Sequence, residues 1–167
     1  MDVPEQNNRE RFLKAYADFA NAIFRHCALR VSSRETAKDL VQETFTRTWK
    51  CIADGQQIEN IRAFLYRIAN NLIVDQYRKA KTTSLDTLTD AGFDVADGGH
   101  EYIVTALESR RAIAALQSIE PHYRQVVIMR HVDGFSVKEI AEILDQNENV
   151  VSIHIHRGLK KLRELLQ

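Results

Sequence analysis

The chain has 167 residues and a formal net charge of zero, with 23 basic and 23 acidic side chains. Apolar residues make up 44% of the chain and charged residues 28%, which is typical of a globular protein. Apolar runs stay short of the roughly 18 residues of a membrane span, and the polar N-terminus lacks the order of a signal peptide. We therefore expect a cytoplasmic protein of one medium or two small domains.

The spacing of cysteine, histidine and acidic residues predicts neither a metal site nor a catalytic site. Cys27 and Cys51 form no Cys-x-x-Cys pair, so we interpret both as reduced, buried residues. His154 and His156 would point about 200° apart on a helix and are unable to share one ion. The sequence lacks a phosphate-binding loop, a nucleophile elbow and paired catalytic carboxylates. We expect no enzyme activity, no cofactor and no small-molecule substrate.

Two amphipathic helices are predicted in the first 55 residues. The first runs from residue 8 to about residue 30, with a buried stripe of Phe12, Tyr16, Phe19, Ile23 and Cys27. A Ser-x-x-Glu capping box at Ser32 and Glu35 starts the second helix, which ends near Gly55. The predicted outward face of the second helix consists of Asp39, Gln42, Glu43, Thr46 and Lys50.

A third helix, predicted from about residue 61 to residue 81, carries five basic residues against Asp75. Periodicity turns Ile61, Phe64, Leu65, Ile68 and Leu72 toward a core, and Tyr66, Arg67, Asn70, Val74, Tyr77 and Lys81 outward. Tyrosines beside basic groups suit an unpaired nucleic-acid strand, because rings stack on bases and cations hold phosphates. The alternative is a helix that packs its tyrosines on a neighbouring element.

Residues 82–100 form the predicted boundary between two helical blocks, with four aspartates and no basic group. Beyond it, a helix over residues 101–119 precedes a helix that begins at Pro121. A turn at Asp133-Gly134 and a second capping box, at Ser136 and Glu139, then start a short helix.

After the break "DQN", Asn147 is expected to cap a last helix over residues 148–166. The residues expected to be buried along it are Val151, Ile155, Leu159, Leu162 and Leu166. The two final helices form a helix-turn-helix, whose second helix often lies in the major groove of DNA.

Four segments of the sequence resemble bacterial sigma factors of the sigma-70 class: "DLVQETFTRTW", "IRAFLYRIANNLIVDQYRK", "YRQVVIMRHVDGFSVKEIAEIL" and "VVSIHIHRGLKKL". The length resembles the extracytoplasmic-function (ECF) group, which keeps only the second and fourth sigma regions. The resemblance implies an all-α protein of two small helical domains joined by an acidic linker. Region 2 would span residues 8–81, the linker residues 82–101, and region 4, with the helix-turn-helix, residues 102–167.

The resemblance implies a transcription initiation factor that directs core RNA polymerase to promoters. Asp39, Gln42, Glu43 and Thr46 match positions that dock on the clamp helices of the largest polymerase subunit. Carboxylates and an amide suit a coiled coil rich in arginine, although simple solvation also explains an acidic face. The flap of the second-largest subunit and an anti-sigma factor are further implied partners.

Two sets of residues match the promoter-binding elements of the family. The set implied to open and hold the −10 element is Gln56, Gln57, Asn60, Arg62, Tyr66, Arg67, Asn70, Asn71, Tyr77, Arg78 and Lys79. The set implied to read the −35 element is Asn149, Ser152, Ile153, His154, His156, Arg157 and Lys160. Family members often have lysine or arginine where Ser152 and His154 stand, so few phosphate contacts are expected here. We therefore expect the last helix to read sequence while the polymerase supplies most of the affinity.

Several alternatives stay open at this level. One is a sigma mimic that sequesters an anti-sigma factor and binds no DNA, although the basic third helix argues against it. Another is a helix-turn-helix regulator acting without polymerase, which leaves the "DLVQETF" face unexplained. Asp86, Asp90, Asp94 and Asp97 either imitate a phosphate backbone in the RNA path of the polymerase or form an ordinary solvated linker. A monomer is expected.

Overall fold

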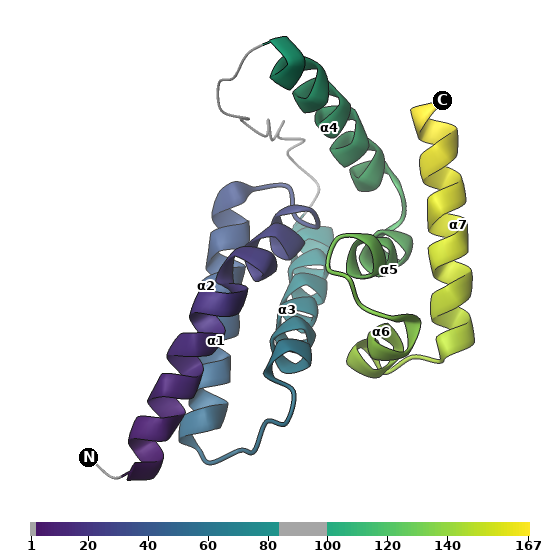
Figure 1. The fold of residues 1–167 in the computed structure, drawn as a ribbon. Helices are drawn as coiled ribbons and strands as arrows, with labels where there is room; N and C mark the ends of the chain where they lie inside the picture. Colours follow the sequence, from purple (N-terminus) through teal and green to yellow (C-terminus); the bar gives the residue numbers. More distant parts are fainter. Residues whose placement is uncertain (1–2, 84–99) are drawn as a thin grey trace.

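The computed structural model describes residues 3–83 and 100–167, and their regular structure is entirely helical (Figure 1). The first unit comprises α1 (Val3–Ala28), α2 (Arg34–Ala53) and α3 (Ile61–Thr83). The second comprises α4 (His100–Ser118), α5 (Pro121–His131), α6 (Val137–Leu144) and α7 (Glu148–Leu166). The all-α prediction is confirmed. Residues 84–99, which make up most of the predicted linker and hold its four aspartates, lie outside the described residues.

Within the two described ranges, no helix combines the length and the hydropathy that crossing a membrane would require.

The helix starts follow local capping chemistry. The Ser136 hydroxyl accepts a hydrogen bond from the Glu139 amide at 3.2 Å, and the Glu139 carboxylate accepts one from the Ser136 amide at 2.7 Å, so the predicted capping box is confirmed. Asn147 caps α7 as predicted. The predicted capping box at Ser32 is wrong, because Ser33 is the N-cap and accepts from the Thr36 amide. Ser33 has an extended backbone that places its hydroxyl over the first helical turn.

The first unit is a bundle in which α1 and α2 run side by side and α3 packs across both (Figure 1). Ile23 and Cys27 of α1 are fully buried against Leu65 and Ile73 of α3 in one hydrophobic cluster. The predicted stripe of α1 is only partly buried toward its N-terminus, because Tyr16 remains 50% exposed. Both cysteines are free, and Cys27 is buried as predicted. Cys51 is only partly buried, which differs from the prediction.

The second unit is held by the close approach of α5 and α7. Gly158 of α7 is buried against α5, and a Cβ atom built there would lie 2.7 Å from Val127 Cγ2 and 3.2 Å from Tyr123 Cβ. Val151 is fully buried as predicted, whereas Leu166 is 42% exposed, so the prediction that Leu166 is buried is wrong. The close approach of the two helices is thus specified by a single missing side chain.

Replacement of Gly158 with alanine is expected to destabilise the protein by up to about 2 kcal/mol. Alanine gains about 1 kcal/mol of helix propensity, but forcing a methyl group onto a short, branched valine costs about 1–3 kcal/mol. Urea unfolding followed by circular dichroism measures the difference. Glu164→Ala, at an exposed position of the same helix, is the control and should change stability by less than about 0.5 kcal/mol. A raised stability in Gly158→Ala would contradict the packing described.

The two units share one core. A continuous cluster of buried side chains joins Tyr66 and Ala69 of α3 to Met129, Phe135 and residues of α6. Tyr66 and Phe135 meet edge to face with ring centroids 4.7 Å apart. The helix-turn-helix unit is therefore packed directly against the third helix, the segment that the sequence predicts to bind nucleic acid.

Candidate functional site

The residues predicted to dock on polymerase lie together on α2. Asp39, Gln42 and Thr46 are exposed, as predicted. Glu43 is half-buried and accepts a hydrogen bond from Arg47 Nε at 2.6 Å. The opposite side of α2 is fixed in the bundle by residues including Ala37, Leu40, Phe45 and Thr48. A rigid helix thus presents a row of carboxylates, an amide and a hydroxyl to solvent.

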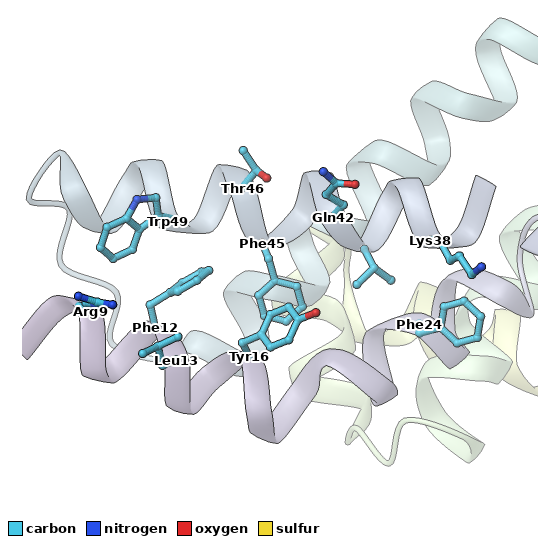
Figure 2. Close-up of a pocket in the computed structure, with 11 residues that line it drawn as sticks. Arg9, Phe12, Leu13, Tyr16, Phe24, Lys38, Gln42, Phe45, Thr46 and Trp49 are labelled. Carbon is cyan, nitrogen blue, oxygen red and sulfur yellow. The ribbon is translucent and has the colours of Figure 1, made fainter. Parts of the chain in front are cut away.

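An apolar groove between α1 and α2 borders this face, with a volume of about 710 Å³ (Figure 2). In Figure 2, Phe12 and Trp49 face each other at one end and Tyr16 meets Phe45 in the middle. Their ring centroids are 5.2 and 4.8 Å apart, respectively. The groove is lined by Arg9, Phe12, Leu13, Tyr16, Phe24, Lys38, Val41, Gln42, Phe45, Thr46 and Trp49. Since Gln42 and Thr46 belong to both surfaces, the polar face and the groove form one continuous candidate docking site.

The loop between α2 and α3 also carries predicted base-reading residues. Gln56 and Gln57 are exposed, and the loop is anchored by the buried Ile58. Asn60 accepts a hydrogen bond from the Ala63 amide at 3.0 Å, so its side chain caps the start of α3. A cavity of about 410 Å³ lies between this loop and α6, bordered by the loop glutamines, Arg67 and Glu142. In this arrangement the loop faces the second unit.

The outward face predicted for α3 is only partly exposed. Arg67, Asn71, Arg78 and Lys79 are exposed, consistent with the prediction. Tyr66 and Asn70 are only 1% and 7% exposed, so the prediction that they point to solvent is wrong. The turn between α5 and α6 packs on Tyr66, and Asn70 accepts a hydrogen bond from the buried Arg30 of α1.

Two further members of the predicted −10 set are also engaged within the chain. Tyr77 is half-buried and donates a hydrogen bond to the Arg30 carbonyl. Arg62 is half-buried and its guanidinium lies 3.9 Å from the centroid of the Phe135 ring. The alternative of tyrosines packed on a neighbouring element therefore describes this arrangement of the chain.

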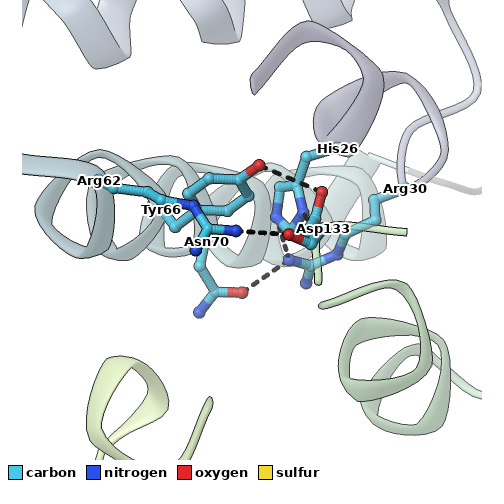
Figure 3. Close-up of polar contacts among 6 residues, drawn as sticks. All are labelled: His26, Arg30, Arg62, Tyr66, Asn70 and Asp133. Atoms are coloured by element: carbon cyan, nitrogen blue, oxygen red, sulfur yellow. Dashed lines mark hydrogen bonds and ion pairs between the residues drawn. The ribbon is translucent and has the colours of Figure 1, made fainter. Parts of the chain in front are cut away.

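A buried polar cluster lies at the centre of the contact between the units (Figure 3). Asp133, in the turn after α5, accepts hydrogen bonds from His26 Nδ1 at 2.7 Å and from the Tyr66 hydroxyl at 3.2 Å. Arg30, 2% exposed, donates through Nη1 to Asn70 Oδ1 at 2.7 Å and to His26 Nε2 at 3.3 Å. The cluster joins α1, α3 and the second unit in one network.

The bonding pattern of the cluster fixes the protonation of His26. Because Arg30 has only protons to donate, His26 Nε2 must accept, and the imidazole proton then resides on Nδ1 and points at Asp133. The imidazole is therefore neutral. Burial lowers the pKa of His26, and the hydrogen bond that His26 donates to Asp133 offsets only part of that effect.

The neutral His26 predicts that the packed arrangement weakens in mild acid. When the cluster is disrupted, His26 regains its ordinary pKa of 6.5 and binds a proton that the packed state excludes. Its contribution to stability is thus present above pH 6.5 and declines below it. At pH 5.5 the loss reaches at most about 1.4 kcal/mol, or roughly 3–6 °C in the thermal midpoint.

Thermal unfolding at pH 7.5 and pH 5.5 tests this expectation. His26→Asn, whose amide can still donate to Asp133, should show a smaller fall in midpoint than the unchanged protein. The matched control is His131→Asn, at an exposed position, which should retain the full fall. Equal falls in all three proteins would contradict a neutral His26 in the cluster.

The last helix presents its predicted −35 face to solvent. Asn149, Ser152, Ile153, His156, Arg157 and Lys160 are all exposed, as predicted from the helical period. The apolar side of α7 packs on α5 and α6 and so fixes which residues face outward. Ile153, 47% exposed, places an apolar side chain in the centre of this face. Such a group is suited to a thymine methyl, and Asn149 to the edge of adenine.

His154 lies at the edge of this face and is partly buried. Its ring packs against Tyr123 and His122 of α5, with centroids 5.5 and 5.1 Å away. Burial lowers the pKa of His154, and the nearby His122 and Arg157 act in the same direction. The imidazole is therefore neutral at pH 7 and adds no positive charge to the helix, in keeping with few phosphate contacts.

The sequence did not predict the buried cluster. His26 and Arg30 continue the apolar stripe of α1 at helical spacing from Ile23 and Cys27, and polar residues in such a stripe indicate a buried polar contact. No pattern in the sequence connects them to Asp133, which lies 107 residues from His26. The pairing depends on how the two units pack, which local periodicity does not encode.

Two sequence profiles match the chain, one for each helical unit. The profile "Sigma-70 region 2" matches residues 15–83, and the profile "Sigma-70, region 4" matches residues 109–162. The first contains the α2 face and α3, and the second contains the helix-turn-helix.

Curated relatives of the chain are described as ECF RNA polymerase sigma factors. The ECF RNA polymerase sigma factor SigW of Bacillus subtilis is 31% identical, over 92% of this chain and 89% of that protein. The ECF RNA polymerase sigma factor BldN of Streptomyces coelicolor is 26% identical over 94% of this chain, which spans 61% of the length of BldN.

Solved structures share the fold. The sigma factor RpoE, in complex with the anti-sigma factor NepR from Bartonella quintana, has a TM-score of 0.79 at 22% identity, over 94% of this chain and 97% of that one. CnrH, in complex with the cytosolic domain of CnrY, has a TM-score of 0.72 at 24% identity, over 98% and 92%. With both regions matched in order and a relative above 30% identity along most of its length, the chain belongs to the ECF group of sigma-70 RNA polymerase sigma factors.

Proposed function

We propose that the chain acts in the bacterial cytoplasm, where it binds core RNA polymerase and directs it to a set of promoters. The observation that carries this proposal is the presence of both sigma regions on one chain, with the α2 face and the −35 face of α7 both exposed. The polymerase supplies the chemistry of RNA synthesis, and the chain supplies promoter choice and help with melting.

Polymerase docking is assigned to Asp39, Gln42, Glu43 and Thr46, with the clamp helices of the largest subunit as the partner. The rigid, exposed helix supports this assignment, since arginine-rich helices bind ordered carboxylates well. The adjoining groove offers apolar surface for the same contact, and its aromatic lining is of the kind found at interface hot spots. The flap of the second-largest subunit is the proposed partner of region 4.

Promoter binding is divided between the two regions. Region 2, residues 8–81, would grip the −10 strand with the basic and tyrosine-bearing face of α3 and the loop before it. Region 4, residues 102–167, would read the −35 element through α7. Because the α7 face has few cations and a neutral His154, we propose that its contacts select sequence and that docking on polymerase supplies the affinity.

An anti-sigma factor is a further proposed partner. The support is that RpoE, a sigma factor of the same fold, was solved bound to the anti-sigma factor NepR. The groove between α1 and α2 is one surface on which such a partner would compete with polymerase.

Capture of genomic DNA fragments on the immobilised chain, with and without core polymerase, tests the proposed division of labour. We expect enrichment only with polymerase, and the enriched fragments should share two short motifs about 25 base pairs apart. The same fragments captured by the chain alone would favour a helix-turn-helix regulator that needs no polymerase. Binding of polymerase without enrichment of any fragments would favour a sigma mimic.

A further inference from the structure

A second cavity between the two units has a volume of about 290 Å³. The loop between α1 and α2 contributes Arg30 and Ser32 to its wall, and the first turn of α2 contributes Thr36. From the second unit, α4 contributes Gln117 and α5 contributes Arg124. Two of the described residues in the wall are arginines, and none of them is acidic. The cavity is therefore polar and positively charged.

Arg30 brings a buried positive charge to this cavity. It is only 2% exposed, and its Nη1 donates to Asn70 and to the neutral His26 (Figure 3). It forms no ion pair with the described residues, and the network connects it to Asp133 only through the His26 ring. Its Nε is buried and has no hydrogen-bond partner in the described part of the chain. Because buried charges and buried donors are normally paired, both features favour an anion as the binding partner.

Arg124 supplies a second positive charge to the same cavity. Its Nε donates to the Leu116 carbonyl at 2.8 Å, and its Nη2 donates to the carbonyls of Gln117 and Ile119 at 2.6 and 3.0 Å. These neutral carbonyls hold the guanidinium at the end of α4 and leave its charge unbalanced. Burial lowers the pKa of Arg30, and the charge of Arg124 acts in the same direction. The two guanidinium groups therefore repel each other, and an anion bound in the cavity would relieve that repulsion.

The neutral groups of the wall also suit an oxyanion. Ser32 and Thr36 provide hydroxyl groups at the start of α2, where the positive end of the helix dipole favours negative charge. Gln76 of α3 and Gln117 of α4 provide amide groups. Guanidinium, hydroxyl and amide donors together match the acceptor oxygens of a phosphate group. Since about 290 Å³ is near the roughly 300 Å³ lower limit of small-molecule pockets, the cavity suits a phosphate group with at most a small substituent.

We propose that this cavity binds a phosphate dianion, either free or as the terminal group of a small phosphomonoester. Arg30 and Arg124 balance its charge, and the hydroxyl groups of Ser32 and Thr36 donate to its oxygens. Because the wall comes from both units, the bound phosphate stabilises the packed arrangement of the chain. The inference goes beyond promoter recognition and does not rest on it, since the site is complete within this chain.

Thermal unfolding of the full-length protein at pH 7.5, in a phosphate-free buffer of constant ionic strength, tests the site with three probes. Inorganic phosphate and glycerol 3-phosphate are mostly dianions at this pH, whereas dimethyl phosphate is a singly charged diester like a DNA backbone phosphate. Gln117→Glu adds a carboxylate to the wall while keeping the backbone carbonyl that Arg124 uses. The matched control, Gln146→Glu, makes the same change at an exposed position between α6 and α7.

For a dissociation constant of about 1 mM, inorganic phosphate at about 10 mM should raise the unfolding midpoint by roughly 3–6 °C, with saturation. Gln146→Glu should show the same rise, and Gln117→Glu should lose most of it. An equal rise with glycerol 3-phosphate assigns the site to monoesters as well, and a rise with inorganic phosphate alone assigns it to the free ion.

Three results would overturn the proposal: no saturable rise with either dianion, equal rises in the two glutamate variants, or an equal rise with dimethyl phosphate. Equal rises in the variants would show a general salt effect, which does not depend on the cavity. These measurements omit polymerase and DNA, so a failure of the chain to support transcription is a separate result that concerns the proposed function alone.

Discussion

Replacement of both Asp39 and Gln42 with alanine is expected to weaken binding to core polymerase by about 2 kcal/mol, or roughly 30-fold. Both side chains are exposed on a helix whose other face is fixed in the bundle, so they contribute to a partner rather than to folding. At limiting polymerase, transcripts from the promoters of this protein should fall in proportion. Competition binding against a labelled sigma factor measures the affinity directly.

The control for this variant is Glu35→Ala on the same helix. Glu35 is exposed and pairs with Lys38 at 3.1 Å in the first turn of α2, one helical turn before Asp39 and outside the assigned docking residues. It should bind polymerase as the unchanged protein does, and both variants should unfold within about 0.5 kcal/mol of it. If the double variant bound polymerase normally, docking would have to be assigned to another surface.

Replacement of Arg30 with alanine is expected to destabilise the protein by about 3–5 kcal/mol. The guanidinium is buried and donates to Asn70 and to His26, so its loss leaves two buried acceptors without a donor. Urea unfolding measures the change, and the thermal midpoint should fall by roughly 2–4 °C for each kcal/mol.

Arg25→Ala provides the comparison for Arg30. Arg25 lies on the same helix but is exposed, so its removal should change stability by less than about 0.5 kcal/mol. A loss below about 1 kcal/mol in Arg30→Ala would show that the polar cluster does not hold the two units together.

Most of the helical framework could be predicted from the sequence because it is encoded locally. The bounds of α7 and the caps at Ser136 and Asn147 follow from short-range chemistry and helical period, and the structure confirms them. The exposed −35 face of α7 was predictable for the same reason, since residues three and four apart share a side. Ser32 was mistaken for Ser33 because two adjacent serines offer the same hydroxyl, and only the backbone conformation selects one.

The state of the α3 face could not be predicted locally. The helical period correctly placed Leu65 and Leu72 on the buried side and Arg67 and Lys81 on the exposed side. It does not show whether another part of the chain covers the side opposite the core. Tyr66 is buried because a turn more than 60 residues away packs on it, and the buried Asn70 is bonded to Arg30 of α1. Packing of the tyrosines on a neighbouring element was one of two alternatives for α3. The contact between Tyr66 and the turn after α5 shows that this alternative holds in the free protein.

Transcription by core polymerase on genomic DNA, with and without the purified chain, is the measurement that tests the central claim most directly. Sequencing the 5′ ends of the transcripts should reveal new start sites preceded by a shared −35 and −10 pattern, and these starts should disappear when Asp39 and Gln42 are replaced together. Transcript starts that are the same with and without the chain, although the chain binds polymerase stably, would contradict the account of a promoter-selecting sigma factor.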